Sequence, residues 1–593
     1  MKIISIVFFL ILSLSTLVVA QPVSNLKVKK VTYIGNESFD DTRLAGLMLT
    51  RSSKFLATSK FYPDIFDDDL STLISFYKQN GFLQAQIIDT TVSIDSLNNE
   101  VDITIKLQEG VRTFVESVSI FGNEFFEDST LQKYIAIKAG DALRRPKIED
   151  AVISLLSLYA EHGFLDATVT PQVQINDSMH LALIDFACQE GISSTVGKIQ
   201  ISGAEKTNQY VLTRELNFHE GDTIKYSQLL NSQRQLYFTG LFSSVFVRPL
   251  PFDSTNSTAR NIIIEVKEKP SSELSFSLGY GTVERVRGRI EYNSSNLGGT
   301  ARKAGAGIEA NFIKQGITLS FSEPWTFGTR WKTDIALTGQ LLQEPSYHAE
   351  TIGSKLTFGH KIGTHTTFST SFRFENTNLS RVDLNAPLDE LDPRIRSLAV
   401  IFSHDTRNNL FDPSKGLYIN WSNELAGSFL QGSNTFVKSV FKIKKFMPTG
   451  RNSVVGTSLE IGWMDSYGES IEIPVNERFY TGGPTSLRAF GYQLVGPLDS
   501  NNEPLGGQFK LVWNIFELRK SIYKMFGMAF FVDAGNVWNN VDEFKISGVR
   551  IDFGSGIRIN SPLGILRIDG SYNPDKQANE SSFKFLFSIG QAF

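Results

Sequence analysis

Apolar and polar residues alternate over short stretches in the last 323 residues of the chain, from 271 to 593. Phe526, Met528 and Phe530, for example, alternate with Gly527 and Ala529. The last stretch places four aromatic rings on one parity, at Phe583, Phe585, Phe587 and Phe593. Alternation with a period of two predicts strands that have one apolar face and one polar or small face. The second half is therefore predicted to be an antiparallel β structure, either a soluble sandwich or a barrel.

A different pattern occupies the chain before residue 270, where one unit of about 80 residues is repeated three times. Each unit opens on a glycine after a short apolar run, at Gly35, Gly122 and Gly203. Each unit also closes on an alternating stretch followed by an acidic residue, at Glu109, Glu190 and Glu268. Because these landmarks keep a constant order, they indicate a true internal repeat.

The middle unit shows the expected secondary structure. Five apolar residues lie at helical spacing, at Ile148, Val152, Leu155, Leu156 and Tyr159. They form one stripe of a helix, which neighbouring strands would bury. Each unit is thus predicted to be a small α/β domain in the order β-α-α-β-β, with boundaries at 26–110, 111–191 and 192–270. The edges of such sheets could accept an extended client peptide as an added strand, although the repeats could equally be spacers.

The first 20 residues predict a secretory signal peptide. Lys2 precedes an apolar stretch from Ile3 to Leu12, and Ala20 provides a small residue at the expected cleavage site. The mature chain is therefore expected to begin near Gln21 and to cross the inner membrane.

Composition narrows the class of protein further. The 58 basic and 62 acidic side chains give a formal charge of -4, so a nucleic-acid partner is not expected. One cysteine, Cys188, excludes an intrachain disulfide framework and paired-cysteine zinc sites. With 46 Phe, 46 Gly and a mean hydropathy of -0.10, the chain is aromatic but polar on average, which fits a large β protein better than a helical membrane protein.

The export signal, together with charged residues on the presumed inner parity, favours a membrane barrel over a sandwich. Strands of about 10 residues joined by turns would give roughly 14 to 18 strands, and an even number is expected. We predict a transmembrane antiparallel β-barrel of 16 strands over 271–593. HExxH and Walker sequences are absent, so no catalytic residue, metal or other cofactor is predicted.

Four further motifs carry a family resemblance. They read HDTRNN at 404–409, GGPTSLRAFGY at 482–492, FVDAGNVW at 531–538 and SPLG at 561–564. With the signal peptide, the repeats and the alternating second half, they resemble the BamA/TamA family of outer-membrane assembly proteins, whose repeats are called POTRA domains. Three repeats make the architecture more similar in size to TamA.

The resemblance implies a specific site. It places Arg488 in a long sixth extracellular loop, folded back into the barrel and paired with acidic residues of the inner wall that match Asp533 and Glu517. Gly482, Gly483, Phe490 and Gly491 would belong to the same loop motif, and Phe583, Phe585, Phe587 and Phe593 to a carboxy-terminal strand signal. An alternative for Arg488 is an exposed loop arginine.

Two details disagree with the family pattern. Phe509, Leu511 and Trp513 have the lipid-facing parity, so Glu517 would face outward unless a β-bulge resets the register. The family usually has a glycine after the arginine, whereas this chain has Ala489.

The resemblance implies that the protein inserts β-barrel proteins into the outer membrane or moves substrates across it. A client strand would pair with an opened first strand, near Ser275–Tyr280, while the last strand, Phe583–Phe593, separates. The implied partners are unfolded outer-membrane proteins, outer-membrane lipid, and accessory proteins of the periplasm or inner membrane, with the repeats in the periplasm. The alternative is a passive outer-membrane pore or secretion channel with periplasmic docking domains.

Overall fold

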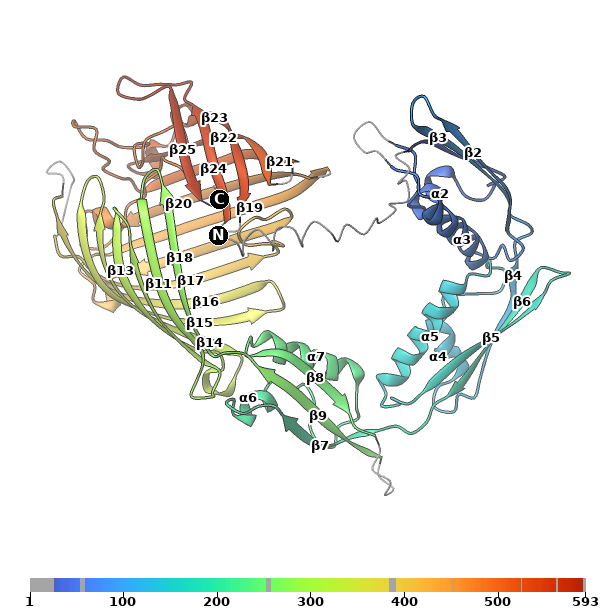
Figure 1. Ribbon diagram of the computed structural model, residues 1–593. Helices are drawn as coiled ribbons and strands as arrows, with labels where there is room; N and C mark the ends of the chain where they lie inside the picture. Colours follow the sequence, from blue (N-terminus) through green and yellow to red (C-terminus); the bar gives the residue numbers. More distant parts are fainter. Residues whose placement is uncertain are drawn as a thin grey trace, which may run out of the picture. The chain divides into compact units, whose positions relative to one another are not determined.

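The computed structural model describes residues 26–53, 59–251, 258–382, 391–450, 452–523, 525–561 and 564–589. The predicted signal peptide, 1–20, and Phe593 lie outside the described residues. The described chain contains three small α/β repeats followed by a sheet of 16 strands (Figure 1).

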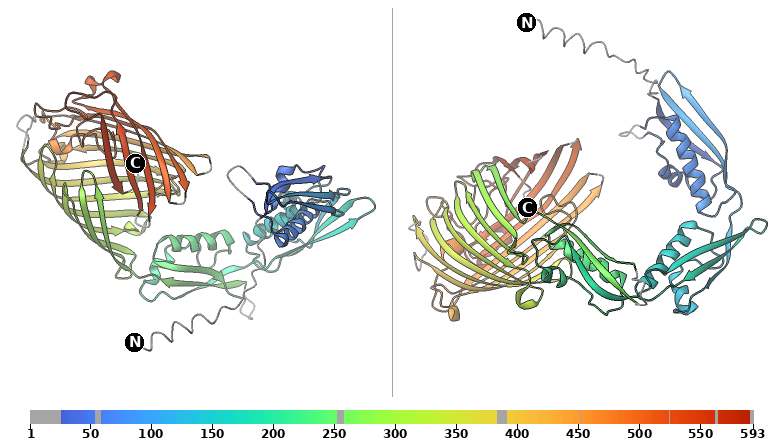
Figure 2. Two further views of the ribbon diagram at one scale, coloured as in Figure 1. Left: turned by 45° about the horizontal axis from the view of Figure 1, so that its top comes forward. Right: turned by 60° about the horizontal axis from the view of Figure 1, so that its bottom comes forward.

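Each repeat has the predicted β-α-α-β-β order, with its helices on one face of a three-stranded sheet (Figures 1 and 2). In the first repeat the elements are β1 (Lys27–Ile34), α2 (Asp41–Leu47), α3 (Pro63–Gln79), β2 (Gln86–Asp95) and β3 (Glu100–Gln108). In the second they are β4 (Phe114–Phe121), α4 (Asp128–Leu131), η1 (Gln132–Tyr134), α5 (Arg145–Ala160), β5 (Thr168–Asn176) and β6 (Leu181–Gln189). In the third they are β7 (Thr195–Ser202), α6 (Gln209–Thr213), α7 (Tyr226–Phe238), β8 (Phe242–Pro249) and β9 (Ala259–Glu268).

The last strand of each repeat is the central one, because the sheet orders are β1-β3-β2, β4-β6-β5 and β7-β9-β8. β3 pairs in parallel with β1 and antiparallel with β2, and β6 pairs in the same way with β4 and β5. The strands β2, β5 and β8 therefore form one edge of their sheets. These edges carry unpaired backbone groups.

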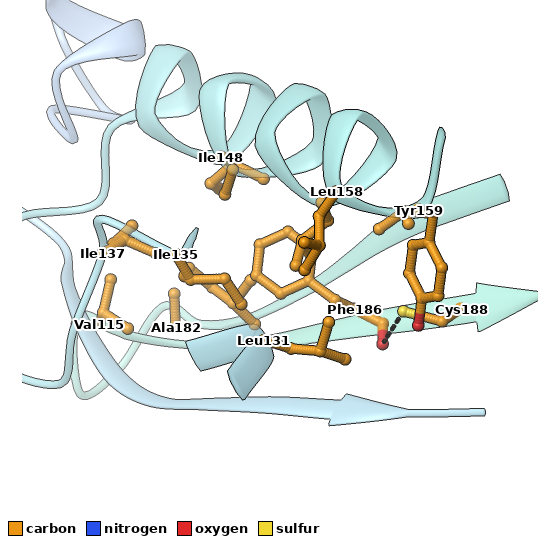
Figure 3. Packing of buried hydrophobic residues seen from close by; sticks show 14 of the residues in the cluster. Val115, Leu131, Ile135, Ile137, Ile148, Leu158, Tyr159, Ala182, Phe186 and Cys188 are labelled. Atoms are coloured by element: carbon orange, nitrogen blue, oxygen red, sulfur yellow. Dashed lines mark hydrogen bonds between the residues drawn. The ribbon is translucent and has the colours of Figure 1, made fainter. Parts of the chain in front are cut away.

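The core of the second repeat lies between α5 and its sheet (Figure 3). Ile148, Leu155 and Tyr159 of the predicted helical stripe are buried, and they pack with sheet residues such as Phe186. Val152 and Leu156 pack against the same cluster while partly exposed. Burial of one helix stripe against one sheet face provides the main stabilisation of such a small domain.

The repeated glycine and the repeated acid have one structural explanation. Gly35, Gly122 and Gly203 have φ angles of +89°, +82° and +84°, and a Cβ atom at Gly122 would lie 2.3 Å from the carbonyl oxygen of Cys188 in the central strand. Only glycine adopts this conformation without strain at such a close approach. The acid that follows the central strand then accepts hydrogen bonds from the loop after the glycine: Glu190, for example, accepts one from the Phe125 amide at 2.9 Å.

We expect Gly122→Ala to loosen the second repeat, because the new methyl group must displace the β6 backbone and alanine resists the positive φ. The cost should be about 1–3 kcal/mol or more in local stability. Hydrogen exchange of the β6 amides in the full chain would measure it. Gly140→Ala is the matched control, since Gly140 has a φ of +84° but no atom within 4 Å of an added Cβ. Equal effects of the two substitutions would show that the close carbonyl is not what requires glycine.

The predicted 16-stranded antiparallel barrel is confirmed, with each strand paired to the next in chain order (Figures 1 and 2). Its strands are β10 (Ser272–Gly281), β11 (Arg285–Leu297), β12 (Arg302–Ala310), β13 (Lys314–Glu323), β14 (Trp331–Gln343), β15 (His348–Ile362), β16 (Thr366–Ser380), β17 (Arg394–Asp405), β18 (Gly416–Ala426), β19 (Phe436–Gly450), β20 (Ser453–Ser466), β21 (Phe509–Tyr523), β22 (Phe526–Trp538), β23 (Arg550–Ser561), β24 (Gly564–Tyr572) and β25 (Phe583–Ile589). We call the end at which β10 begins the near rim and the opposite end the far rim.

The alternation read from the sequence separates the two faces of the wall. In β22, Phe526, Met528 and Phe530 are exposed on the outer face, whereas Phe531 and Asp533 are buried inside. An outer band of aromatic and aliphatic side chains is the surface that lipid requires. Within the described residues, no helix is both long and apolar enough to cross a membrane.

The sheet is nearly closed, and its two ends meet at a seam between β10 and β25. The strand order runs from β10 to β25 without joining them. The described hydrogen bonds across the seam connect Thr282, just after β10, with Phe587: the Thr282 amide donates to the Phe587 carbonyl at 3.2 Å, and the Phe587 amide donates to the Thr282 hydroxyl at 2.9 Å. Residues 590–593, the end of the predicted last strand, lie outside the described residues.

Candidate functional site

The connection between β20 and β21, residues 467–508, is the longest loop of the far rim and folds into the barrel. We call it the lumen loop. Its residues Leu487, Ala489, Phe490 and Val495 are buried in one cluster with Val512 of β21. The loop motif predicted from the sequence therefore lies against the inner wall.

Arg488 stands at the centre of this contact and is fully buried. Its Nε and Nη2 atoms donate to the two carboxylate oxygens of Asp533 at 2.6 and 2.9 Å, and Nη1 donates to Glu517 Oε2 at 2.5 Å. The guanidinium also lies over the Phe531 ring, 3.3 Å from its centroid. A bidentate pair with a second carboxylate, closed by an aromatic face, fixes the orientation of an arginine as well as its charge.

The placement of Glu517 depends on a register shift. The pairing of β21 with β22 shifts between Asn514 and Phe516, and the pairing with β20 shifts opposite it. Trp513 and Phe516 consequently both face outward, and Glu517 turns inward with its side chain 2% exposed. The outward orientation that unbroken alternation predicted for Glu517 is therefore wrong, because a bulge moves the side chains that follow it to the opposite face.

Further charged residues extend this cluster, and sequence reasoning did not assign them a role. Asp552 of β23 accepts a hydrogen bond from the Ala489 amide at 3.1 Å. Asp569 of β24 pairs with Arg558 at 2.5 Å and with Arg567 at 3.1 Å. In the sequence, Arg567 and Asp569 are marked only by their inward-facing positions in an alternating strand. Such positions do not show which charged residues contact the loop.

The glycines of the motif shape the loop around Arg488. Gly482 and Gly483 have φ angles of +107° and +105°, and a Cβ at Gly482 would lie 2.4 Å from the Gly491 carbonyl oxygen. Ala489, in contrast, is not among the residues with positive φ, so its position does not require the glycine usual in the family. Its amide instead holds the loop on Asp552.

The lumen loop also contacts the strands next to the seam. Lys584 of β25 donates to the Phe490 carbonyl at 2.8 Å, and Arg567 of β24 donates to the Pro484 carbonyl at 2.8 Å. On the other face of β25, Phe583 and Phe585 are exposed, and the Phe587 ring lies 6.0 Å from that of Tyr280 across the seam. The loop motif and the aromatic last strand are thus joined through Lys584.

The cluster is built from arginine–carboxylate ion pairs. In the described parts of the chain, no group of three or more His, Cys, Asp or Glu side chains is arranged to hold a metal ion. Arginine–carboxylate pairs in a site screened from water resist separation, since a charge left unpaired there is costly.

Comparison with known proteins agrees with this architecture. A repeat described as surface antigen variable number repeat, POTRA, matches residues 26–110, 113–191 and 194–269. The outer membrane protein assembly factor BamA of Nitratidesulfovibrio vulgaris is 22% identical over 96% of this chain and 74% of its own length. BamA of Neorickettsia risticii is 24% identical over 91% of this chain and 75% of its own length.

A solved structure supports the fold. The crystal structure of BamA from Haemophilus ducreyi lacking POTRA domains 1-3 superimposes with a TM-score of 0.69, at 19% identity, over 81% of this chain and 99% of that chain. The Omp85 superfamily domain matches residues 296–593, which is half of the sequence. The chain therefore belongs to the Omp85 superfamily.

Proposed function

We propose that this protein assembles β-barrel proteins into the bacterial outer membrane. Its barrel lies in the outer membrane and its repeats in the periplasm, so the near rim faces the periplasm. The observation that carries the proposal is the seam: the described bonds across it join Phe587 of β25 to Thr282, just after β10, whereas the neighbouring strands are paired along their length.

A weak seam suits insertion because an opened strand can pair with a client. In lipid, each unpaired backbone group costs several kcal/mol, so β10 and β25 can separate only if another strand takes the place of the lost partner. A client strand that pairs with β10 satisfies these groups and is itself placed in the bilayer. The process needs no nucleotide, because each broken hydrogen bond is replaced.

The repeats would receive the client before the barrel does. β5 is an edge strand of its sheet, and most of its side chains are exposed. An extended chain can add to such an edge through backbone hydrogen bonds, largely irrespective of its sequence. We therefore assign unfolded outer-membrane proteins as the clients and outer-membrane lipid as the surrounding partner, with accessory proteins of the periplasm or inner membrane docking on the repeats.

The lumen loop argues against a permanently open pore. Its buried cluster fills part of the barrel interior, and Arg488 is held there by three charge-assisted hydrogen bonds. A loop held inside the barrel narrows the lumen, which a passive channel does not require. In the proposed function the loop instead supports the wall beside the moving seam.

Reconstitution tests the assembly function against the pore. We expect vesicles that contain the purified chain to convert an unfolded outer-membrane barrel protein into a protease-resistant, heat-modifiable form, with little conversion in empty vesicles. Single-channel recording on the same vesicles completes the test. Steady conductance without client folding would favour the passive pore and contradict the proposal.

A further inference from the structure

A second buried ion cluster joins the lumen loop to another part of the wall. Glu477 ends the short helix η4 (Val475–Glu477) and its side chain is 6% exposed. Arg373 of β16 donates to Glu477 Oε1 at 2.7 Å, and Lys438 of β19 lies 3.2 Å from Glu477 Oε2. The Lys438 ammonium also donates to the Glu477 backbone carbonyl at 2.7 Å. Both the side chain and the backbone of this loop residue are therefore bound by the wall.

The wall holds Arg373 in place for the loop. Arg373 is also bound by Glu424 of β18 at 2.6 Å and by Glu375 at 3.0 Å, so its guanidinium is oriented by the barrel itself. Glu477 is the carboxylate that pairs with Lys438. A carboxylate that meets this preoriented guanidinium makes charge-assisted bonds with little ordering cost.

Apolar packing on both sides of Glu477 encloses the cluster. Val475 is fully buried among Tyr347, Ala349 and Leu379. Phe479 packs with Phe436 and Met464, and it fits because position 462 is glycine: a Cβ at Gly462 would lie 2.6 Å from the Phe479 ring. Low exposure of this kind strengthens ion pairs and penalises their separation.

The two ion clusters have opposite polarity and lie on different parts of the wall. Arg488 is a loop cation bound by anions of β21 and β22, whereas Glu477 is a loop anion bound by cations of β16 and β19. In sheet order β16 is six strands from β10, and β19 is six strands from β25. β21 and β22 are four and three strands from β25, so the Arg488 contact is nearer the seam than the Glu477 contact, which is six strands from it on each side.

We propose that Glu477 is a second, fixed anchor of the lumen loop, distinct from the Arg488 contact. The loop around Arg488 is bound by Arg567 of β24 and Lys584 of β25, so it moves with the strands next to the seam, while the pairing of Glu477 with Arg373 and Lys438 keeps the loop attached to the static wall. Glu477 is thus a positioning residue. The inference deepens the proposed function, but the anchor itself can be tested without any client.

Thiol labelling of the folded full chain tests the anchor. In a Cys188→Ser background, Val475→Cys reports on the Glu477 anchor and Leu487→Cys reports on the Arg488 contact, since both side chains are fully buried. Loss of charged hydrogen bonds by Glu477→Gln should raise the labelling rate of Val475→Cys about ten- to a hundredfold. The rate at Leu487→Cys should change far less. Glu469→Gln, which alters an exposed acid of the same loop, should change neither rate.

Lys438→Met provides an independent variant that leaves Glu477 intact, and it should raise the labelling rate at Val475→Cys as Glu477→Gln does. Heat-modifiable migration shows which variants have folded barrels. Unchanged labelling at that position in the folded variants would overturn the proposal. Equal increases at both reporters would also overturn it, because the loop would then have a single attachment. Neither result depends on client insertion, so it can be told apart from failure of the assembly function.

Discussion

A disulfide across the seam is expected to abolish client insertion. Thr282→Cys with Phe587→Cys would link the two residues whose backbones already bond across the gap, in a Cys188→Ser background. The covalent bond prevents β10 and β25 from separating, so no strand edge is offered to the client. We expect insertion by the oxidised protein to fall to the level of empty vesicles and to return on reduction.

The cause is the cost of a strand edge in lipid. Each backbone group that loses its partner there costs several kcal/mol, so insertion depends on a concerted exchange of partners, and blocking one strand blocks the whole exchange. The matched control is Phe276→Cys with Ile290→Cys, at directly paired positions of β10 and β11 on the exposed outer face. That disulfide crosses a pair that stays together in the proposed mechanism, so activity should be retained. Full activity of the oxidised seam variant would show that the client does not enter through this seam.

Alternation made the barrel predictable, because a wall between lipid and a polar lumen imposes the same period on every strand. Phe530 and Phe531 show the limit of that reasoning, since an aromatic ring faces each side. Phe531 faces inward by the parity of its strand, and alternation does not predict the tertiary contact in which the Arg488 guanidinium covers its ring. Glu517 shows a second limit: a bulge after Asn514 reverses the parity of the strand as far as Ser521, and no residue type there marks it.

The lumen loop was predictable only where a family motif covers it. Arg488 and Asp533 could be paired by resemblance, although they are 45 positions apart. Glu477 lies outside the motif, and its partner Arg373 is 104 positions away. The strand that contains Arg373 shows only an alternation of apolar and polar residues, which does not mark this arginine. Loops have no period, so the wall residue that a loop charge meets is fixed by the folded barrel and not by local sequence.

Arg488→Ala is expected to release the lumen loop from β21 and β22. The substitution leaves the Asp533 and Glu517 carboxylates buried without their shared cation, which typically costs about 3–5 kcal/mol. Cells that depend on the variant should show reduced levels of outer-membrane barrel proteins and weaker heat-modifiable migration of the protein itself. Arg488→Lys should give an intermediate result, because an ammonium keeps the charge but cannot reproduce the planar fork that binds both oxygens of Asp533.

A surface arginine provides the control for the Arg488 variants. Arg302 of β12 lies 2.5 Å from Glu323, the same distance that joins Arg488 to Glu517, but its side chain is half exposed. Exposed pairs contribute about 0–1 kcal/mol, so Arg302→Ala should leave client levels and migration nearly unchanged. A large difference between two arginines with equal ion-pair distances would assign the effect to burial in the lumen. Normal client levels in Arg488→Ala would instead mean that the loop lock is dispensable, and that the seam opens and closes without the support of the loop beside it.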